Sequence, residues 1–469
     1  MAGACAAAAS PTLTLFPCEL PGVEERALCG VHEVWEDRSA ESGRRIPLRV
    51  VLLPAGSPTP APDPIVVLQG GPGASNVASA RGFANSPQRA DRNILLVDLR
   101  GTGGSAPLDC GFQSGYSSTG YLEDFLPIDK LRACRDSLSA HADLTQYVTP
   151  HVVDDLAEVL DALAIQQVNL HGFSGGTRQA LAFIRRHPDR VRAAILEGPV
   201  PLDARIPFTF ARDAQEALDG VLSDCLADSA CGRAFPAIRR EFLSVLGRLD
   251  SAPVPVSVAL PDGTVRISLS RPAFAQVVRY MLYRPASAAA LPLTIHRAAR
   301  GDYTRLGRAA VSVGVGGGIS IGFYVSNTCS EDLPWFTDAE AIAAAAGTFL
   351  GTYRLRQQRA ACGEWPRAEL PAGYLEQVRS SVPVLILVGE RDPVTPPRWG
   401  HEVAEQLSNA QVVVVPGGGH AFGDLEPRGC LPAIREQFLA RASVAGLPVE
   451  CVSRVRRPPF QLPDPGESR

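Results

Sequence analysis

A serine lies at the centre of the segment His171–Gly176, which has the pattern Gly-x-Ser-x-Gly around Ser174. The preceding residues, Gln167–Leu170, have the composition of a short buried strand, and Thr177–His187 carries apolar side chains at helical spacing. A strand, a sharp turn and a helix form the setting in which a serine is exposed as a nucleophile. Glycines let the backbone turn tightly, and free N–H groups at the helix start favour a developing negative charge. The segment therefore predicts nucleophilic catalysis by Ser174, if the chain supplies a base and an acid.

An acid and an imidazole follow two later apolar segments. Asp392 comes after Val382–Val388, and His420 comes after Gln411–Val415. The carboxyl ends of parallel strands lie along one edge of a sheet, so we expect both side chains near Ser174. An imidazole must take the proton of the serine, and a carboxylate must hold that imidazole in the right tautomer. The chain order of nucleophile, acid and base predicts a catalytic triad.

A glycine-rich loop, Gln69–Gly73, follows the apolar run Ile65–Leu68. No Gly-Lys-Ser/Thr follows it, which argues against a nucleotide-binding P-loop. In a hydrolase such a loop supplies one donor of the oxyanion hole. We therefore expect the N–H of Gly175 and an N–H of Gly70 or Gly71 to bind the oxyanion.

Other side chains compete for these roles. His171 ends the strand before the serine, and we expect it to be a packed core residue. Asp98 precedes Ser174 in the chain, and we expect it to pair with Arg100 or to shape its own loop. The remaining competitors lie on or near predicted helices, where a solvated role is the default: His151, His187 and His401.

The elements around these residues alternate between strands and helices, which predicts an α/β fold with a parallel sheet covered on both faces. From about residue 203 to residue 375 the pattern is mainly helical, with one hairpin around Val254–Leu269. We expect five parts: an irregular N-terminal segment (1–30), the first part of an α/β domain (31–202), a mainly helical cap (203–378), the second part of the α/β domain (379–455) and a C-terminal tail (456–469).

Composition excludes several classes of protein. The 469 residues are 45% hydrophobic and 20% charged, which is typical of a globular chain. The net charge of −4 gives no reason to expect nucleic acid as a partner. No run of 18 strongly apolar residues occurs, so we expect no membrane span. Cysteine and histidine do not cluster as zinc ligands would, and we expect neither a metal nor a cofactor.

Cysteine content predicts disulfides and an oxidising compartment. After Cys5, the cysteines fall into five neighbouring pairs, although the sequence leaves their connectivity open. The segment Ala2–Cys5 resembles the end of a bacterial lipoprotein signal, in which the cysteine is acylated; the alternative is an unpaired tail cysteine. The pairs expected as disulfides are Cys18–Cys29, Cys110–Cys134, Cys225–Cys231, Cys329–Cys362 and Cys430–Cys451.

Three of these segments together resemble a known family. Gln69–Gly73, Asp98–Ser105 and the segment around Ser174 are similar to the proline iminopeptidase group of α/β-hydrolases, and more closely to its secreted tripeptidyl-aminopeptidase-like branch. The resemblance extends from about Cys18 to about Cys451 and includes five further segments: 134–149, 154–156, 329–335, 362–366 and 429–451.

The resemblance implies an α/β-hydrolase fold, a mostly parallel sheet flanked by helices with a mainly helical inserted cap. It also implies Ser174, Asp392 and His420 as the triad, local disulfides, and a secreted, periplasmic or lipid-anchored bacterial protein. The activity it implies is release of residues from a free N-terminus. One position departs from the family pattern: Gly175 stands where an aromatic residue is expected after the serine, which changes a wall of the substrate pocket.

An aminopeptidase needs carboxylates to bind the ammonium group of its substrate. The candidates are Glu197, Glu331 and Asp332, with a solvated or helix-capping acid as the alternative for each. The function we expect is that of a serine hydrolase working through an acyl-enzyme, an aminopeptidase on short peptides. The alternatives are a carboxylesterase acting on small esters with the same triad, and a non-catalytic binding protein on this scaffold. The sequence makes no prediction of oligomeric state.

Overall fold

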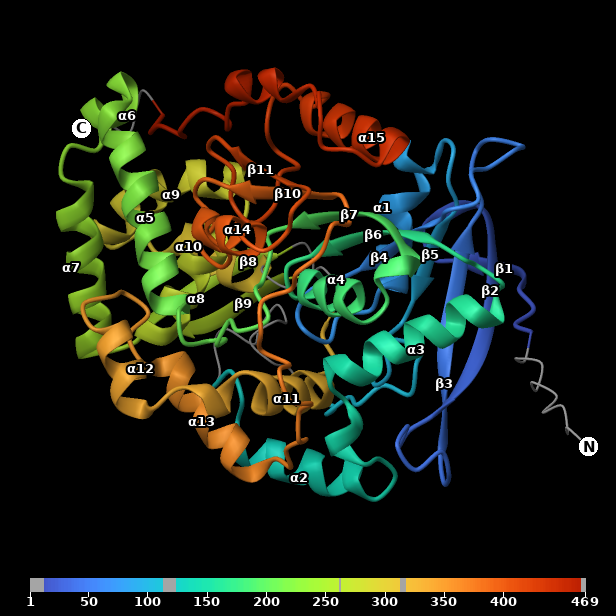
Figure 1. Cartoon of the computed structure of the whole chain (residues 1–469). Helices are drawn as coiled ribbons and strands as arrows, with labels where there is room; N and C mark the ends of the chain where they lie inside the picture. Colours follow the sequence, from blue (N-terminus) through green and yellow to red (C-terminus); the bar gives the residue numbers. More distant parts are fainter. Residues whose placement is uncertain (1–11, 113–123, 261–262, 313–317, 465–469) are drawn as a thin grey trace, which may run out of the picture.

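Nine strands form one sheet in the order β1-β2-β3-β5-β4-β6-β7-β10-β11 (Figure 1). The computed structural model describes residues 12–112, 124–260, 263–312 and 318–464. Strands β1, β2, β3 and β5 pair antiparallel, and the pairs from β5 to β11 are parallel. The bounds are β1 Phe16–Leu20, β2 Val23–Trp35, β3 Arg45–Leu53, β4 Ile65–Leu68, β5 Ile94–Val97, β6 Val168–Phe173, β7 Val191–Glu197, β10 Val384–Gly389 and β11 Ala410–Val415.

Alternating side chains of the central strands pack into two cores, one on each face of the sheet. In β4, Val66 and Leu68 join the core that contains α3 and α4, whereas Ile65 and Val67 join the core that contains α1 and α15. Because both faces are covered, β4 and β5 are apolar throughout, as expected for strands of a buried parallel sheet. The flanking helices are α1 Ala80–Ala84, α3 Thr149–Ala162, α4 Gly175–Arg186, α14 Pro397–Ala404 and α15 Cys430–Arg441. Helix α2 Ile128–Ser139 instead packs against two helices of the inserted part, α11 Ile321–Glu331 and α13 Tyr353–Glu364.

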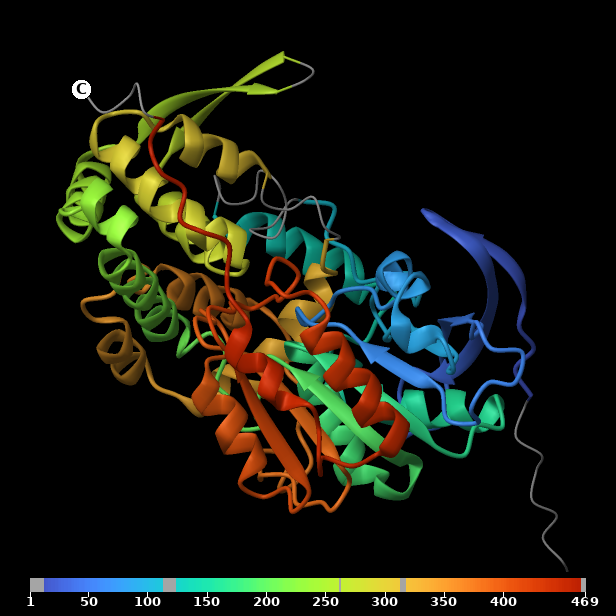
Figure 2. The ribbon, with the colours of Figure 1, turned by 90° about the horizontal axis from the view of Figure 1, so that it is seen from above.

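The chain between β7 and β10 forms the mainly helical part of the protein. It lies on the side of the molecule away from strands β1–β3 (Figures 1 and 2). Strands β8 Val254–Leu260 and β9 Gly263–Leu269 form the expected hairpin, which projects from this part (Figure 2). We call residues 198–383 the cap. Its helices are α5 Phe210–Ala227, α6 Ser229–Ala234, α7 Ile238–Ser251, α8 Arg271–Met281, α9 Pro285–Ala299, α10 Thr304–Ser312, α11 Ile321–Glu331, α12 Asp338–Ala345 and α13 Tyr353–Glu364.

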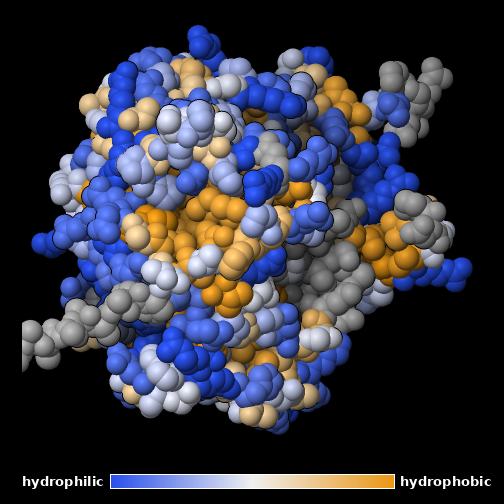
Figure 3. Space-filling model, turned by 90° about the vertical axis from the view of Figure 1, so that its right-hand side faces the viewer, coloured by the Kyte–Doolittle hydropathy of each residue, from blue (hydrophilic) through white to orange (hydrophobic). Residues whose placement is uncertain are grey.

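The expectation that the N-terminal segment is irregular was wrong for part of it. Residues 1–30 are not irregular as a whole, because β1 and most of β2 lie within them and extend the sheet. The strands bury Leu20 and Ala27 but leave Phe16 and Val31 exposed, at 64% and 56% of their surfaces. Apolar side chains gather on the side of the molecule that β1–β3 form (Figure 3). Cys5 lies outside the described residues.

Five disulfides connect the cysteines in the pairs expected from the sequence. Each cross-links neighbouring segments: Cys18–Cys29 joins β1 to β2, Cys329–Cys362 joins α11 to α13, and Cys430–Cys451 joins the start of α15 to a later turn. Within the described part of the chain, no helix combines the length and apolar character needed to cross a bilayer.

Candidate active site

Ser174 lies in the sharp turn between β6 and α4, with φ of 51° and ψ of −124°. A residue with a side chain rarely adopts positive φ, so the surrounding structure must hold this conformation. The N–H of Ser174 donates to the carbonyl of Glu197 at 2.8 Å, and its own carbonyl accepts from Thr177 N–H at 2.9 Å. A Cβ atom at Gly176 would lie 2.0 Å from the carbonyl oxygen of Leu68, which explains the glycine. The turn therefore presents the serine beside the end of β4.

Asp392 and His420 lie beyond the ends of β10 and β11 and contact each other. His420 Nδ1 is 2.8 Å from Asp392 Oδ2. The other carboxylate oxygen, Oδ1, accepts from the N–H groups of Val394 and Thr395 at 2.8 and 2.9 Å. These bonds fix the carboxylate, which in turn fixes the imidazole ring through Nδ1. Nε2 is then the ring nitrogen left to exchange a proton with a reacting group.

Thr395 is a third member of this arrangement that the sequence argument missed. Its hydroxyl donates to Asp392 Oδ2 at 2.8 Å and lies 3.2 Å from His420 Nδ1. A Cβ atom at Gly198 would approach the Thr395 hydroxyl to 2.7 Å and His420 Cε1 to 3.1 Å. Gly198, at φ of 61°, therefore leaves room for the imidazole. The Asp-Pro-Val-Thr segment could have indicated Thr395, because the hydroxyl of a residue three positions after an aspartate often donates to the aspartate's carboxylate.

The Gly70–Gly71 loop lies against the serine. A Cβ atom at Gly70 would be 2.7 Å from Ser174 Cβ and 3.2 Å from Ser174 Oγ. A Cβ atom at Gly175 would be 3.5 Å from the backbone nitrogen of Gly71. The cap fixes this loop, since Ser320 N–H donates to the carbonyl of Gly73 at 3.0 Å. The structure thus brings the three glycines expected at an oxyanion hole to the same place as Ser174.

The cap also contacts the histidine. The Tyr283 ring, which follows α8, meets the His420 ring edge to face with centroids 5.0 Å apart. The Tyr283 carbonyl accepts from Ala421 N–H at 2.9 Å. Gly419 has no room for a side chain beside the carbonyls of Leu282 and Tyr283. No sequence pattern indicates Tyr283, because its contact with His420 depends on how the cap lies on the sheet.

Glu331 and Asp332 are not where a substrate could contact them, which corrects their expected role. Both side chains are buried. Asp332 Oδ1 accepts from Arg178 Nη2 at 2.8 Å. Glu331 accepts from the N–H of Thr149 and the hydroxyl of Tyr374, each at 2.6 Å. Burial raises the pKa of both carboxyls despite the charge of Arg178. These acids join the cap to α3 and α4 and are not open to an ammonium group.

Glu197 lies nearer the site, but its charge is also neutralised. Arg435 of α15 donates to its two oxygens at 2.7 and 2.9 Å, and His171 Nε2 lies 2.8 Å from Oε1. Burial opposes ionisation, yet the Arg435 charge and the His171 contact lower the pKa of Glu197 to about 2. The carboxylate is therefore ionised and paired. It lines a cavity of about 420 Å³ that His420 also lines.

The competing residues have structural roles. His171 is buried as expected, and burial lowers its pKa. Asp98 shapes its own loop by accepting from the Ser75 hydroxyl and from Val77 and Gly104 N–H at 2.7 to 2.9 Å. Arg100 pairs with Asp155 at 2.6 and 2.7 Å, so the alternative pairing with Asp98 is wrong.

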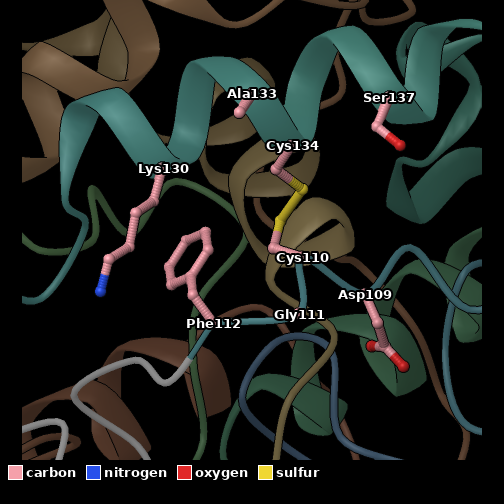
Figure 4. Close-up of a pocket in the computed structure, with 8 residues that line it drawn as sticks. All are labelled: Asp109, Cys110, Gly111, Phe112, Lys130, Ala133, Cys134 and Ser137. Carbon is pink, nitrogen blue, oxygen red and sulfur yellow. A yellow bond between two sulfur atoms is a disulfide. The ribbon is translucent and has the colours of Figure 1, made fainter.

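A second cavity of about 600 Å³ lies beside the Cys110–Cys134 disulfide. Figure 4 shows Lys130 and Phe112 extending into the same space below α2. Ser174, Asp392 and His420 are absent from its lining, so we do not assign it to the candidate active site. Across the described ranges, no group of three or more His, Cys, Asp or Glu side chains is placed to hold a metal ion.

Two family models match the chain. A model of the alpha/beta hydrolase fold matches residues 63–231, which include Ser174. A model of TAP-like proteins matches residues 347–451, which include Asp392 and His420.

Individual relatives match shorter stretches. The serine protease Hip1 of Mycobacterium tuberculosis H37Rv is 29% identical over 227 residues, 44% of this chain and 42% of Hip1. The proline iminopeptidase of Neisseria meningitidis serogroup B is 28% identical over 135 residues, 29% of this chain and 32% of that enzyme. The chain therefore spans less than half the length of these curated relatives. A solved proline iminopeptidase from Mycobacterium smegmatis covers 88% of this chain and 98% of its own at 16% identity and a TM-score of 0.41, from which no shared function follows.

The parallel sheet, the serine turn after β6 and the first family match define the chain as an α/β-hydrolase. The second match and the named relatives add a likeness to TAP-like proteins and to proline iminopeptidases over parts of the chain. This likeness agrees with the resemblance noted in the sequence.

Proposed function

We propose that the chain is a serine hydrolase that cleaves peptides through an acyl-enzyme. The observation that carries the proposal is the 2.8 Å contact between Asp392 and His420 at the sheet edge where the strained Ser174 turn lies. The two family matches and the relatives named serine protease and proline iminopeptidase support it.

The proposed mechanism assigns one task to each group. Ser174 Oγ attacks the carbonyl carbon while His420 Nε2 takes its proton, and Asp392 stabilises the resulting imidazolium through Nδ1. The N–H of Gly175 and an N–H of the Gly70–Gly71 loop stabilise the oxyanion. His420 then protonates the leaving amine, the C–N bond breaks, and the acyl group stays on Ser174. Water, deprotonated by the same imidazole, releases the acid and restores the serine.

Aminopeptidase action is the finer part of the proposal, and the names of the relatives support it. The ammonium of such a substrate would have to bind groups other than Glu331 and Asp332, which are buried. Glu197 is a weak candidate for binding the substrate's ammonium group, because Arg435 already neutralises its charge.

A chromogenic panel tests the proposal. Aminoacyl and tripeptidyl p-nitroanilides with a free N-terminus are compared with their N-acetylated forms and with p-nitrophenyl esters, using Ser174→Ala as the blank. Turnover of anilides establishes a peptidase, and a loss of turnover on acetylation establishes an aminopeptidase. Ester turnover with no anilide turnover at any pH would favour the carboxylesterase instead.

We also propose that the protein acts outside the cytoplasm, secreted or in the cell envelope. Five disulfides support this, because disulfides persist in oxidising compartments. A lipid anchor at Cys5 is the finer form of the proposal. It predicts a diacylglyceryl mass increment on the N-terminal peptide of protein purified from membranes, and an unmodified peptide there would contradict it.

A further inference from the structure

The cavity beside His420 lies between the ends of β6 and β7 and the chain that leads into α15. His420 is at one end, and the Glu197–Arg435 pair is part of its wall. Phe173, the residue before the serine, contributes to the wall as well. The cavity, at about 420 Å³, falls in the size range of ligand sites.

The walls of this cavity are fixed without a ligand. The Cys430–Cys451 disulfide holds the start of α15. Glu426 and Arg456 exchange two backbone hydrogen bonds, of 3.0 and 2.8 Å, which hold the segment after His420. Arg435 connects α15 to the sheet through Glu197. A site whose walls are already ordered loses little free energy to rearrangement when a ligand binds.

The chemistry of the walls favours an apolar group. The charge of Glu197 is neutralised by Arg435, so no unpaired carboxylate from this residue faces the cavity. The other walls include aromatic and aliphatic side chains, on which an apolar side chain can bury its surface. These are Phe173, Phe422, Leu425, Leu431 and Val455.

The position of the cavity assigns it to one side of the cleaved bond. In the sheet order, β4 with the Gly70–Gly71 loop lies on one side of β6, and β7, β10 and β11 lie on the other. The cavity adjoins His420, and neither Gly70, Gly71 nor Gly175 lines it. In acyl transfer, the leaving amine must lie within reach of the imidazolium that protonates it. The leaving group therefore lies on the His420 side.

We propose that this cavity is the leaving-group subsite and binds the apolar side chain of the residue on the carboxyl side of the cleaved bond, of the size of leucine or phenylalanine. The inference rests on the proposed function and names a part of its substrate. The same subsite must bind an amine that attacks the acyl-enzyme in the reverse direction. In that step the amine nitrogen bonds to the acyl carbon, its proton passes to His420, and the bond to Ser174 Oγ breaks.

Acyl transfer measures this subsite directly. The acyl-enzyme is formed from the best peptidyl ester of the panel, and phenylalanine amide or glycine amide is added at equal concentration. The ratio of aminolysis to hydrolysis is measured for each. We expect phenylalanine amide to be favoured at least about tenfold, since burial of its side chain stabilises the bound amine. Equal partitioning of the two amides would overturn the proposal.

A variant pair locates the effect in the cavity. Gly423 lines it, and an added Cβ atom there meets nothing within 4 Å, so the backbone site accepts a side chain and Gly423→Phe is the variant chosen to narrow the cavity. Gly247 of α7 has the same open surroundings and is not among the residues that line the cavity, so Gly247→Phe is the matched control. The phenylalanine amide preference should fall to within about twofold of parity in Gly423→Phe and persist in Gly247→Phe. An undiminished preference in Gly423→Phe would overturn the proposal.

Failure of this inference is distinguishable from failure of the proposed function. The proposed function is tested by the anilide panel with Ser174→Ala as the blank, and its leaving group is always p-nitroaniline, so the panel does not depend on a preference among amino acid amides. Turnover of the anilides together with equal partitioning of the two amides would refute the proposed subsite and leave the proposed peptidase function intact.

Discussion

The Thr395 hydroxyl contacts both partners of the acid–base pair. We expect Thr395→Val to reduce kcat about tenfold, because Asp392 loses a hydrogen bond and the imidazole loses part of its support. KM should change little, since Thr395 Oγ1 bonds to the triad side chains. Steady-state kinetics on the best anilide check this. Thr395→Ser keeps the hydroxyl and should restore most of kcat; equal losses in both variants would contradict the role of the hydroxyl.

At the residue scale, the sequence placed Ser174, Asp392 and His420 because each follows a buried apolar strand. That pattern is local in the sequence, and the parallel sheet places the carboxyl ends of these strands along one edge. Tyr283 has no such signal, since its contact with His420 comes from the packing of the cap. The expected ammonium role of Glu331 and Asp332 failed for a related reason: nothing near them in the chain reveals that Arg178 is their partner.

The ion pair between Arg178 and Asp332 joins α4, the helix behind the serine, to the cap at the end of α11. We expect Arg178→Met to destabilise the protein by about 3 kcal/mol or more, because it leaves two buried carboxyl groups without their cation. Urea unfolding measures the loss. The matched control is Arg186→Met on the same helix, whose half-exposed pair with Asp154 should contribute less than about 1 kcal/mol. Similar effects of both variants would contradict the account.

The contact of Arg435 with Glu197 joins α15 to β7 and makes stability depend on pH. The folded state holds the pKa of Glu197 at about 2, below the usual glutamate value of 4.5, because the Arg435 charge and the His171 contact outweigh the effect of burial. A lowered pKa stabilises the fold above the unfolded value, and this stabilisation is lost as the pH falls from about 4.5 to about 2. It amounts to about 3 kcal/mol at neutral pH.

Glu197→Gln should therefore be less stable at pH 7 and lose less stability than wild type between pH 5 and pH 3. Urea midpoints across that interval measure the difference. Glu436→Gln changes an exposed acid on α15, next to Arg435, and should behave like wild type. Parallel pH profiles for Glu197→Gln and wild type would contradict the assignment.

At the element scale, the central strands were predictable because they are continuous apolar runs buried on both faces. Strand β1 and the first part of β2, before Val31, were not predicted, because the outer part of the sheet leaves side chains such as Phe16 exposed and interrupts the apolar pattern. Their pairing depends on partners across the sheet and on the Cys18–Cys29 bond, which propensity alone does not encode.

Over the whole molecule, the alternation of strands and helices was sufficient to predict a parallel sheet covered on both faces and its helical insertion; the α/β-hydrolase fold followed from the order of the triad residues and the family resemblance. The way the cap covers the site was not predictable, because it depends on contacts between segments more than a hundred residues apart, such as Tyr283 with His420 and Arg178 with Asp332.

The disulfides restrict the unfolded chain to different extents. Cys329 and Cys362 are 33 residues apart, and Cys225 and Cys231 are 6 apart. In the chain-entropy model, the longer loop contributes about 4 kcal/mol and the shorter one about 2 kcal/mol. All four cysteines are buried, so double alanine variants carry similar packing losses and the shorter pair is the matched control. Guanidinium unfolding should show the larger loss for the pair at 329 and 362, and the reverse order would contradict this account.

The central claim is that Ser174 is a nucleophile activated by His420. Fluorophosphonate labelling followed by peptide mapping tests it most directly, because the reagent bonds only to an activated serine. We expect one phosphonyl group on Ser174, no labelling of Ser174→Ala, and labelling slowed by several orders of magnitude in a folded His420→Ala. Labelling at another serine, or a normal rate in His420→Ala, would contradict it.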